Sequence, residues 1–321
     1  MSWIDKAQTF LVILSVGVGL ILGQINWIAQ ISPILILPLL ILMLYLTFLP
    51  IALRKFSGIL NQFKVVFLSL TINFIWTPIF AWILGIVFLA NAPDLRIGLI
   101  MLMVTPCTDW YIIFTGIAKG DVTLATGLLP LNLILQIVLL PLYLLIFTDN
   151  LVKINVNELF ESVFLVLILP LAIATITRYF IFQQKKTIKW FYLNIPKINL
   201  TQLLTLNLAI VAIFASQGNT LLNSPQIFLQ LLTPIPLFFA INFLLAYGIK
   251  NYFHFSYEQF ACFSCTTLSR NSPLSLAIAT SIFPSQPLIS LTLIIGPLIE
   301  LPIMVLVSQL LLKIRNIKPK V

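Results

Sequence analysis

Long apolar segments recur along the whole chain and are separated only by short polar gaps. Hydrophobic residues make up 60% of the 321 positions, charged residues make up 8%, and the mean hydropathy is +1.09, outside the range of soluble domains. A helix needs roughly 20 mostly apolar residues to cross a bilayer. Segments such as PILILPLLILMLYLTFLPIAL (33–53) are apolar on every side, whereas the strands of a membrane barrel would alternate. The sequence therefore predicts an all-α integral membrane protein.

Charges, prolines and polar clusters divide the chain into ten predicted transmembrane spans. They lie near residues 7–27, 33–53, 65–89, 96–117, 122–148, 157–182, 200–216, 226–250, 257–283 and 286–312. The first stretch has no small-residue cleavage pattern and is soon followed by another span, so we interpret it as a helix and not as a removed signal peptide.

The basic residues predict the orientation of these spans. With a cytoplasmic N-terminus, fifteen of the eighteen lie on the inner side: Lys6, Arg54, Lys55, Lys64, Lys119, Arg178, Lys185, Lys186, Lys189, Lys197, Lys250, Lys313, Arg315, Lys318 and Lys320. The positive-inside rule then predicts both termini in the cytoplasm, in the plasma membrane or, in a bacterium, the inner membrane. Because these residues lie in short loops beside apolar spans, we read the net charge of +9 as a topology signal and expect no nucleic-acid partner.

Two spans are interrupted by polar residues around a proline, at TPCTD (105–109) and SRNSP (269–273). With five spans in each half, residues 1–150 and 151–321 can be related as inverted repeats, and the interruptions then fall at corresponding places. Backbone groups freed by a broken helix cannot face lipid, and paired breaks are typical of transporter sites. Plain kinks at Pro106 and Pro273 are the alternative, since the chain has 19 prolines.

Three charged residues lie deep in predicted spans, namely Asp109, Arg270 and Glu300. A charge at mid-membrane costs at least about 2.5–3.5 kcal/mol, so such residues usually face a cavity or one another. Arg270 could pair with Glu300 or Asp109, either to fix the helix bundle or to serve transport. In the second case Arg270 would be a fixed cation near a negative substrate or in place of a bound cation, and Glu300 would carry a proton.

The cysteines Cys107, Cys262 and Cys265 lie in or beside apolar segments and are expected to be free thiols. Cys107 is either a small buried apolar residue or, beside the first break, a soft ligand suited to trivalent arsenic or antimony. The pair in CFSC has no second pair or nearby histidine, so no metal site and no cofactor is predicted. His254, the only histidine, is expected at the membrane interface.

Polar residues elsewhere in the spans include Asn73, Asn132, Gln136 and Asn242. Hydrogen bonding between helices is their default role. Asn132 and Gln136 are four residues apart and share a helix face, so they could also line a cavity beside the first break.

Two parts of the sequence resemble a known family. PCTDWYIIFTGIAKGD (106–121) with LLPLNLILQIVLLPLY (128–143), and GPLIELPIMVLV (296–307), are similar to the fourth, fifth and tenth spans of the arsenical-resistance permeases, which extrude arsenite and belong to the bile acid:sodium symporter superfamily. The resemblance implies two inverted five-helix repeats, arranged as a panel domain and a core domain in which the discontinuous fourth and ninth helices cross near the substrate.

The resemblance also implies site residues and chemistry. Cys107 matches the cysteine that those permeases require, and Glu300 matches their membrane glutamate, which suggests that uncharged arsenous acid leaves while protons enter. Taking the residues of both breaks together, we predict a substrate site of Cys107, Thr108, Asp109, Arg270, Asn271 and Ser272, with Glu300 and Asp109 as coupling residues. We predict that Asn73, Asn132, Gln136 and Thr266 line a cavity beside it. Membrane lipid is the other expected partner.

This chain departs from the family pattern at both breaks. Asp109 and Trp110 stand near a place where the arsenite permeases carry a small polar residue. SRNSPLSLA (269–277) is similar to the Q-N-S pattern of sodium-coupled relatives with Arg270 replacing the glutamine, and Thr266 stands where those relatives have a glutamate. We therefore expect sodium-independent transport, and Arg270 keeps a small organic or inorganic anion open as the substrate.

Other functional classes fit the sequence less well. No H-E-x-x-H or G-x-S-x-G motif supports an intramembrane enzyme. Paired breaks with ionisable residues suit alternating access better than a channel. A receptor built on a transporter scaffold usually has an added signalling domain, and this sequence shows none.

Overall fold

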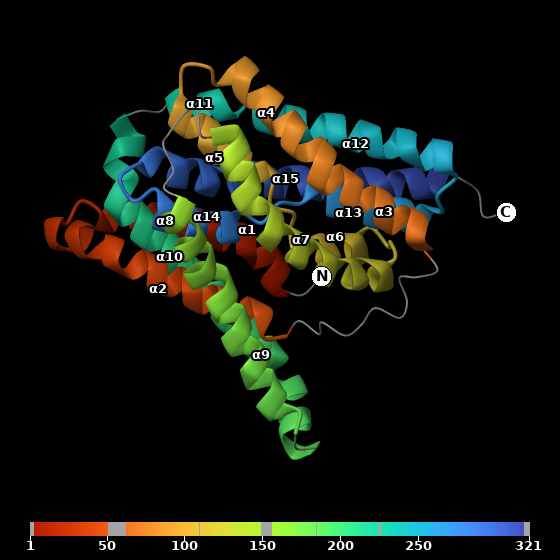
Figure 1. Ribbon diagram of the computed structural model, residues 1–321, viewed down its shortest axis with the longest axis horizontal. Coiled ribbons are helices and arrows are strands. Elements are labelled where there is room, and N and C mark those ends of the chain that lie inside the picture. Colours follow the sequence, from red (N-terminus) through yellow and green to blue (C-terminus); the bar gives the residue numbers. More distant parts are fainter. Residues whose placement is uncertain are drawn as a thin grey trace. The chain divides into compact units, whose positions relative to one another are not determined.

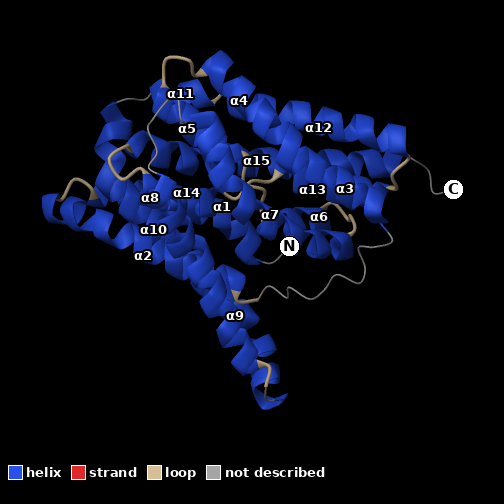
Figure 2. Cartoon of the chain, viewed as in Figure 1, coloured by secondary structure: helices blue, strands red, loops and turns tan. Residues whose placement is uncertain are grey.

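The computed structural model describes residues 3–50, 62–108, 110–148, 156–183, 185–223 and 226–317. These residues are almost entirely helical, and their only strand-like feature is one isolated antiparallel bridge (Figures 1 and 2). The helices are α1 (Trp3–Leu22), α2 (Asn26–Phe48), α3 (Phe63–Thr71), α4 (Thr77–Phe88), α5 (Pro93–Met103), α6 (Trp110–Ile117), α7 (Val122–Thr148), α8 (Val156–Val163), α9 (Leu169–Ile181), α10 (Lys185–Asn223), α11 (Gln226–Leu231), α12 (Pro234–Phe253), α13 (Tyr257–Leu268), α14 (Ser272–Ile282) and α15 (Pro287–Ile317), with π-helices η2 (Ile72–Trp76) and η3 (Phe164–Ile168). The all-α prediction is confirmed.

Seven helical segments among the described residues are long and apolar enough to cross a membrane. They are Asn26–Phe48, Phe63–Phe88, Val122–Phe147, Leu159–Ile181, Ile188–Ser216, Leu229–Phe253 and Pro287–Arg315. The other three predicted spans correspond to α1, with 20 residues, and to the interrupted pairs α5 with α6 and α13 with α14.

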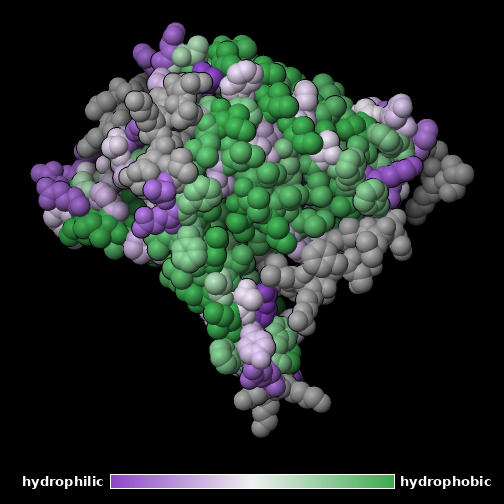
Figure 3. Space-filling view, in the orientation of Figure 1, coloured by the Kyte–Doolittle hydropathy of each residue, from purple (hydrophilic) through white to green (hydrophobic). Residues whose placement is uncertain are grey.

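The exposed side chains of these helices are apolar. Figure 3 shows hydrophobic residues over much of the visible surface, and Ile75, Val87 and Leu244 are 59%, 64% and 67% exposed. A surface of this kind is stable against lipid and not against water. The protein is therefore a multi-pass membrane protein.

Two predicted boundaries were wrong by several residues. Span two was expected to begin at Pro33, but α2 begins at Asn26 and holds Pro33 and Pro38 inside the helix. Span seven was expected over 200–216, but α10 runs from Lys185 to Asn223. Proline usually ends a soluble helix, and lysines are expected outside the apolar core of a membrane. In a long membrane helix neighbouring segments support the backbone groups that proline frees, and lysines near the helix end extend toward the interface.

The chain forms two compact units. Unit 1 comprises residues 1–52, 154–225 and 273–294, and unit 2 comprises residues 53–153, 226–272 and 295–321. Each unit draws segments from both halves of the sequence, so these units are not the predicted repeats 1–150 and 151–321. Whether the halves are related by inverted repetition stays a prediction.

In unit 1, α10 packs against α1 and α2, and α2 packs against α9. Small residues allow the backbones of α1 and α10 to approach closely. A Cβ atom on Gly19 would lie 2.7 Å from the carbonyl oxygen of Val211, and one on Gly23 would lie 2.7 Å from that of Ala215. The hydroxyl of Ser15 donates to Asn207 Oδ1 across the same pair of helices at 2.8 Å.

In unit 2, α13 packs against α3, α6, α7 and α12, and α4 packs against α5 and α12 (Figure 1). Trp76 Nε1 donates to Asn242 Oδ1 at 3.0 Å and joins η2 to α12. Asn242 thus has the helix-to-helix role that is the default for a polar residue in a span. Unit 2 also holds both ends of the first break and the start of the second, where the candidate site lies.

Candidate functional site

The first interruption lies between α5 and α6. Helix α5 ends at Met103, residues 104–108 lie outside the helices, and α6 begins at Trp110. Thr105 Oγ1 donates to the carbonyl oxygens of Met101 and Leu102 at 3.0 and 3.2 Å. The last carbonyls of α5 therefore keep hydrogen-bond partners although the helix ends inside the protein.

The second interruption lies between α13 and α14. Helix α13 begins with a capping box formed by Ser256 and Gln259 and ends at Leu268, after which Ser269 is extended with φ −70° and ψ 138°. Helix α14 begins at Ser272, which is 2% exposed, and Pro273 is its second residue, where a missing N–H costs no helical hydrogen bond. Ser269, Arg270 and Asn271 are all buried.

The two interruptions cross within unit 2 as an antiparallel bridge between Pro106 and Arg270. The backbone N–H of Cys107 donates to the carbonyl of Ser269 at 3.0 Å, and that of Asn271 donates to the carbonyl of Thr105 at 2.7 Å. Asn271 Nδ2 also donates to Thr108 Oγ1 at 3.2 Å. Each break thus supplies partners for backbone groups that the other has freed, as a buried non-helical segment in a membrane requires.

Arg270 is 2% exposed, and its guanidinium is surrounded mainly by carbonyl oxygens. Nε donates to the carbonyl of Leu268 at 3.1 Å and Nη1 to that of Met103 at 2.9 Å. Nη2 donates to the carbonyl of Thr267 and, at 3.2 Å, to Asn73 Oδ1. The ring of Phe238 lies 5.2 Å from Cζ, within the range of a cation–π contact.

Glu300 lies in α15 and is 5% exposed. Its Oε1 atom accepts a hydrogen bond from the backbone N–H of Arg270 at 2.8 Å. The side-chain pairing of Arg270 with Glu300 that the sequence suggested is therefore not what the structure has, because the guanidinium turns to the carbonyls. Within the described residues no carboxylate oxygen lies within hydrogen-bonding distance of the guanidinium.

Cys107 lies in the first interruption and is 3% exposed. Its Sγ atom accepts a hydrogen bond from the backbone N–H of Trp110 at 3.3 Å, which caps the start of α6. Cys262 and Cys265 are buried free thiols in α13. Asp109 lies outside the described residues.

Three further expected residues form a chain of contacts that leads away from Arg270. Asn73, in the π-helix η2, accepts from Arg270 and donates through Nδ2 to the carbonyl of Thr266 at 3.3 Å. Thr266 Oγ1 accepts from Asn132 Nδ2 at 3.3 Å. The structure thus brings together Asn73, Asn132 and Thr266. The extra residue of a π-turn turns a side chain away from its usual helical direction, and such turns are frequent at functional sites.

Gln136 lies one turn beyond Asn132 on α7 and is fully buried. Neither amide atom of Gln136, nor Asn132 Oδ1, has a hydrogen-bond partner in the described part of the chain. The structure therefore places Gln136 on the same helix face as Asn132 but records no contact that joins its amide to Cys107, Arg270 or Glu300.

Sequence reasoning missed the groups that hold Arg270. Phe238 is an apolar residue in an apolar helix, and nothing in its surroundings distinguishes it. The carbonyls of Met103, Thr267 and Leu268 carry no side-chain signal, because every residue has one. The π-turn at Asn73 has no recognised sequence pattern either, although its asparagine drew attention.

This chain is similar to one protein family and to several individual proteins. The profile of the Sodium Bile acid symporter family matches residues 37–224. The arsenical-resistance protein Acr3 of Corynebacterium glutamicum is 24% identical over 327 residues, which cover 95% of this chain and 88% of that protein. The Acr3 protein of Alkaliphilus metalliredigens is 24% identical over 231 residues, covering 72% of this chain and 65% of its own length. An uncharacterized transporter of Synechocystis sp. is 24% identical over 343 residues and covers 97% of this chain and 88% of its own.

Proposed function

The chain belongs to the Sodium Bile acid symporter family, and from this membership we propose that it is a secondary-active transporter that exports arsenite and antimonite in exchange for protons. The family is one of transporters and not of enzymes. Two similar proteins are named arsenical-resistance proteins, and they match most of this chain. The observation that carries the proposal is the crossing of the two helix breaks, with Cys107 donating its backbone N–H to Ser269 at that crossing.

Cys107 supplies the chemistry that favours this substrate. Trivalent arsenic and antimony are soft centres that prefer thiol sulfur. The thiol would displace one hydroxyl of arsenous acid, forming a sulfur–arsenic bond and releasing one water, and the reverse reaction would free the substrate. Asp109, Thr108, Asn271 and Ser272 follow in the same two breaks and complete the proposed substrate site.

Glu300 is the proposed proton carrier. It is buried, and it accepts a hydrogen bond from the backbone of Arg270 inside the second break. A carboxyl group in this place can change its protonation while touching the segment that borders the substrate. Proton entry through Glu300 would then accompany release of uncharged arsenous acid on the other side.

The arginine supports transport that does not need sodium. Its guanidinium is a fixed positive charge that already uses the carbonyls of Met103, Thr267 and Leu268. Carbonyl oxygens are also the ligands that hard cations prefer, so the guanidinium occupies a place where a cation could have been bound. We propose that this arginine replaces a sodium ion.

The finer architecture follows the same proposal. We propose ten spans arranged as two inverted five-helix repeats, with both termini in the cytoplasm and with the protein in the plasma membrane, or in the inner membrane of a bacterium. Unit 1, which holds α1, α2 and α8–α10 together with α14, would contain the panel domain, and unit 2 would contain most of the core domain. The paired breaks and the distribution of basic residues support this arrangement.

The direct test is arsenite accumulation in cells that lack their own efflux systems. Wild type, Cys107→Ser and Glu300→Gln are compared at matched expression. We expect lower accumulation with wild type than with empty cells, and loss of that difference in both variants. Accumulation equal to that of empty cells would reject arsenite export.

The coupling ion is tested in proteoliposomes. Transport of arsenite is measured under an imposed pH gradient and under an imposed sodium gradient, with choline as the neutral replacement. We expect acceleration by the pH gradient and no response to sodium. A strong sodium requirement would contradict the proposed role of Arg270.

A second candidate is a carrier of a small organic or inorganic anion that does not strictly depend on sodium. The observation that favours it is the buried guanidinium without a carboxylate partner in the described residues, since such a group can hold an anion. Saturable uptake of anions into the same proteoliposomes, lost in Arg270→Gln, would support this function. Passive conductance without saturation would instead indicate a channel.

A further inference from the structure

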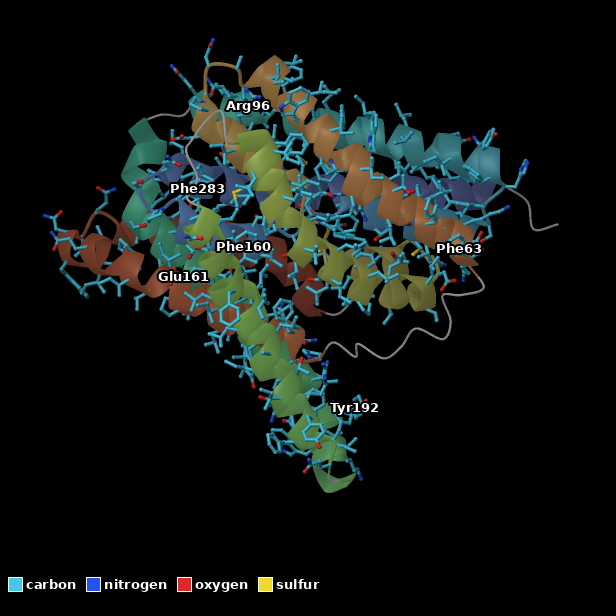
Figure 4. The ribbon with its side chains drawn as sticks, viewed as in Figure 1. Phe63, Arg96, Phe160, Glu161, Tyr192 and Phe283 are labelled. Carbon is cyan, nitrogen blue, oxygen red and sulfur yellow. The ribbon has the colours of Figure 1, made fainter. Side chains whose placement is uncertain are left out.

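The turn that joins α9 to α10 in unit 1 combines basic and aromatic residues. Arg178 lies in the last turn of α9, and Lys185, Lys186 and Lys189 lie in the first turns of α10. Figure 4 shows Tyr192 near this turn, on α10. The rings of Phe191 and Tyr192 lie 6.1 and 6.2 Å from the ring of Phe182, which packs the two helices together at this end.

The length of α10 indicates where this end lies. Its 39 residues span about 58 Å at 1.5 Å per residue, whereas the hydrocarbon core is only about 30 Å thick. The helix therefore extends into the headgroup region. Its lysine-bearing start is suited to that environment, because lysines at helix ends extend their ammonium groups toward the interface.

The exposed aromatic residues at this end agree with such a position. Tyr179 and Phe180 are 65% and 63% exposed on α9, and Trp190 and Tyr192 are 59% and 58% exposed on α10. Tyrosine and tryptophan gather at the level of lipid headgroups, since their rings are apolar and their tips are polar. The turn thus has the composition of a segment that lies at the headgroups.

Helices α9 and α10 contain no acidic residue. The sequence contains no aspartate or glutamate between Glu161 and Glu258. Arg178 Nη1 is buried and has no hydrogen-bond partner within the part of the chain that the structure describes. Arg178 lies one turn before Phe182, whose ring contacts Phe191 of α10, and Lys189 lies two residues before Phe191, so both basic residues lie at the same end of this helix pair. A buried, unpaired guanidinium donor is costly unless an anion accepts from it.

We propose that Arg178, with Lys189, binds the phosphate of an anionic phospholipid such as phosphatidylglycerol. The guanidinium fork fits two phosphate oxygens, and the ammonium of Lys189, which is exposed on α10, adds attraction without fixed geometry. A zwitterionic lipid fits less well, because its own ammonium already offsets the phosphate charge. The positive-inside rule predicts that this basic turn faces the cytoplasm, so the proposed lipid belongs to the cytoplasmic leaflet.

The experiment measures lipid binding to the purified full-length protein by native mass spectrometry, with phosphatidylglycerol or phosphatidylcholine added. We expect phosphatidylglycerol to bind about tenfold tighter. Arg178→Gln should lower that affinity about fivefold, and adding Lys189→Gln should lower it further, as expected for one interfacial charge each. Arg178→Lys should keep part of the affinity. Lys313→Gln, which removes an exposed charge from α15, is the matched control and should change it less than twofold.

Three results would overturn the proposal. The first is equal binding of the two lipids, and the second is equal loss in Arg178→Gln and Lys313→Gln, which would show a general effect of net charge. The third is displacement of the lipid by millimolar inorganic phosphate, which would indicate a site for a free anion. Circular dichroism and the midpoint of thermal unfolding confirm that each variant is folded before its binding is compared.

Discussion

The two helix breaks of unit 2 satisfy the backbone groups of interrupted helices in different ways. In the first break, Thr105 donates to the carbonyls of α5 and Cys107 Sγ accepts from the start of α6, so short neutral side chains satisfy nearby backbone groups. In the second break, the long side chain of Arg270 reaches carbonyls on both α5 and α13 and an asparagine on η2. The Thr105 and Cys107 side chains of the first break thus bond to neighbouring backbone groups, whereas the Arg270 side chain of the second connects three elements.

This difference indicates how structural support and substrate chemistry are divided between the two breaks. Arg270 uses its donors to hold the site together, so its charge is fixed in position. The thiol of Cys107 accepts a weak hydrogen bond from the backbone N–H of Trp110, and such a contact can be exchanged for a substrate at little cost. We therefore expect the second break to carry stability and the first to carry the chemistry of the substrate.

The largest effect is expected for Arg270→Leu. Removing the guanidinium leaves Asn73 Oδ1 and three buried carbonyls with fewer donors, and each unsatisfied buried group costs about 1–3 kcal/mol. We expect the free energy of unfolding to fall by about 2–4 kcal/mol and transport to be lost. The midpoint of thermal unfolding in detergent measures the first effect.

Arg270→Lys is the matched variant for this prediction. Lysine keeps the charge but has three donors and no planar fork, so its stability should lie between those of wild type and Arg270→Leu. Wild-type stability of the leucine variant would show that the second break does not depend on this side chain.

A smaller and more selective effect is expected for Cys107→Ser. The serine oxygen can still accept from Trp110, so we expect unfolding free energy within about 1 kcal/mol of wild type. Arsenite transport should nevertheless fall at least tenfold, because oxygen does not replace a soft sulfur ligand. Transport in proteoliposomes and thermal unfolding are measured on the same preparations.

Cys265→Ala is the control for that comparison. Cys265 is an equally buried thiol, but it lies within α13, outside the break. Transport close to wild type is expected in this variant. Equal loss of transport in the two variants, or no loss in Cys107→Ser, would contradict the proposal that the first break carries the chemistry of the substrate.

The sequence allows much of the fold to be predicted, for a physical reason. The apolar spans follow from the need to match the bilayer, and the breaks stand out because polar residues and proline cluster inside apolar runs. Glu300 and Arg270 draw attention because charges within a membrane are rare. These signals belong to single residues and their immediate neighbours.

What sequence reasoning could not give depends on distant partners. The guanidinium of Arg270 was expected to pair with Glu300 or Asp109. In the described residues it donates to carbonyls of α5 and α13 and not to Glu300, while Asp109 lies outside them. The start of α10 was expected to be a loop because of its lysines, yet the helix begins at Lys185. The charge of a residue predicts that it needs a hydrogen-bond partner or water. It does not predict which backbone atom is that partner, or whether a helix continues to the charged residue.

The smallest expected effect joins α15 to the first break. A Cβ atom on Gly296 would lie 2.5 Å from Leu102 Cδ2, and Leu102 is the penultimate residue of α5. Gly296→Ala should therefore push Leu102 and the end of α5, at a cost of about 1–2 kcal/mol, since overpacking a buried site forces small shifts. Transport should slow severalfold, because Thr105 and Cys107 follow directly. Thermal unfolding and transport rates measure both effects.

Two further variants test whether the contact between Gly296 and Leu102 causes the loss of stability and transport rate. Gly248 in α12 has open space where a Cβ would lie, so Gly248→Ala should leave stability unchanged or raise it slightly. Leu102→Ala combined with Gly296→Ala should cost less than the sum of the two single changes, because the smaller side chain removes the clash. Strict additivity would place the effect of Gly296→Ala elsewhere. It would also mean that Gly296 does not position the end of α5. Helix α15 would then act on the site through Glu300, which contacts the second break.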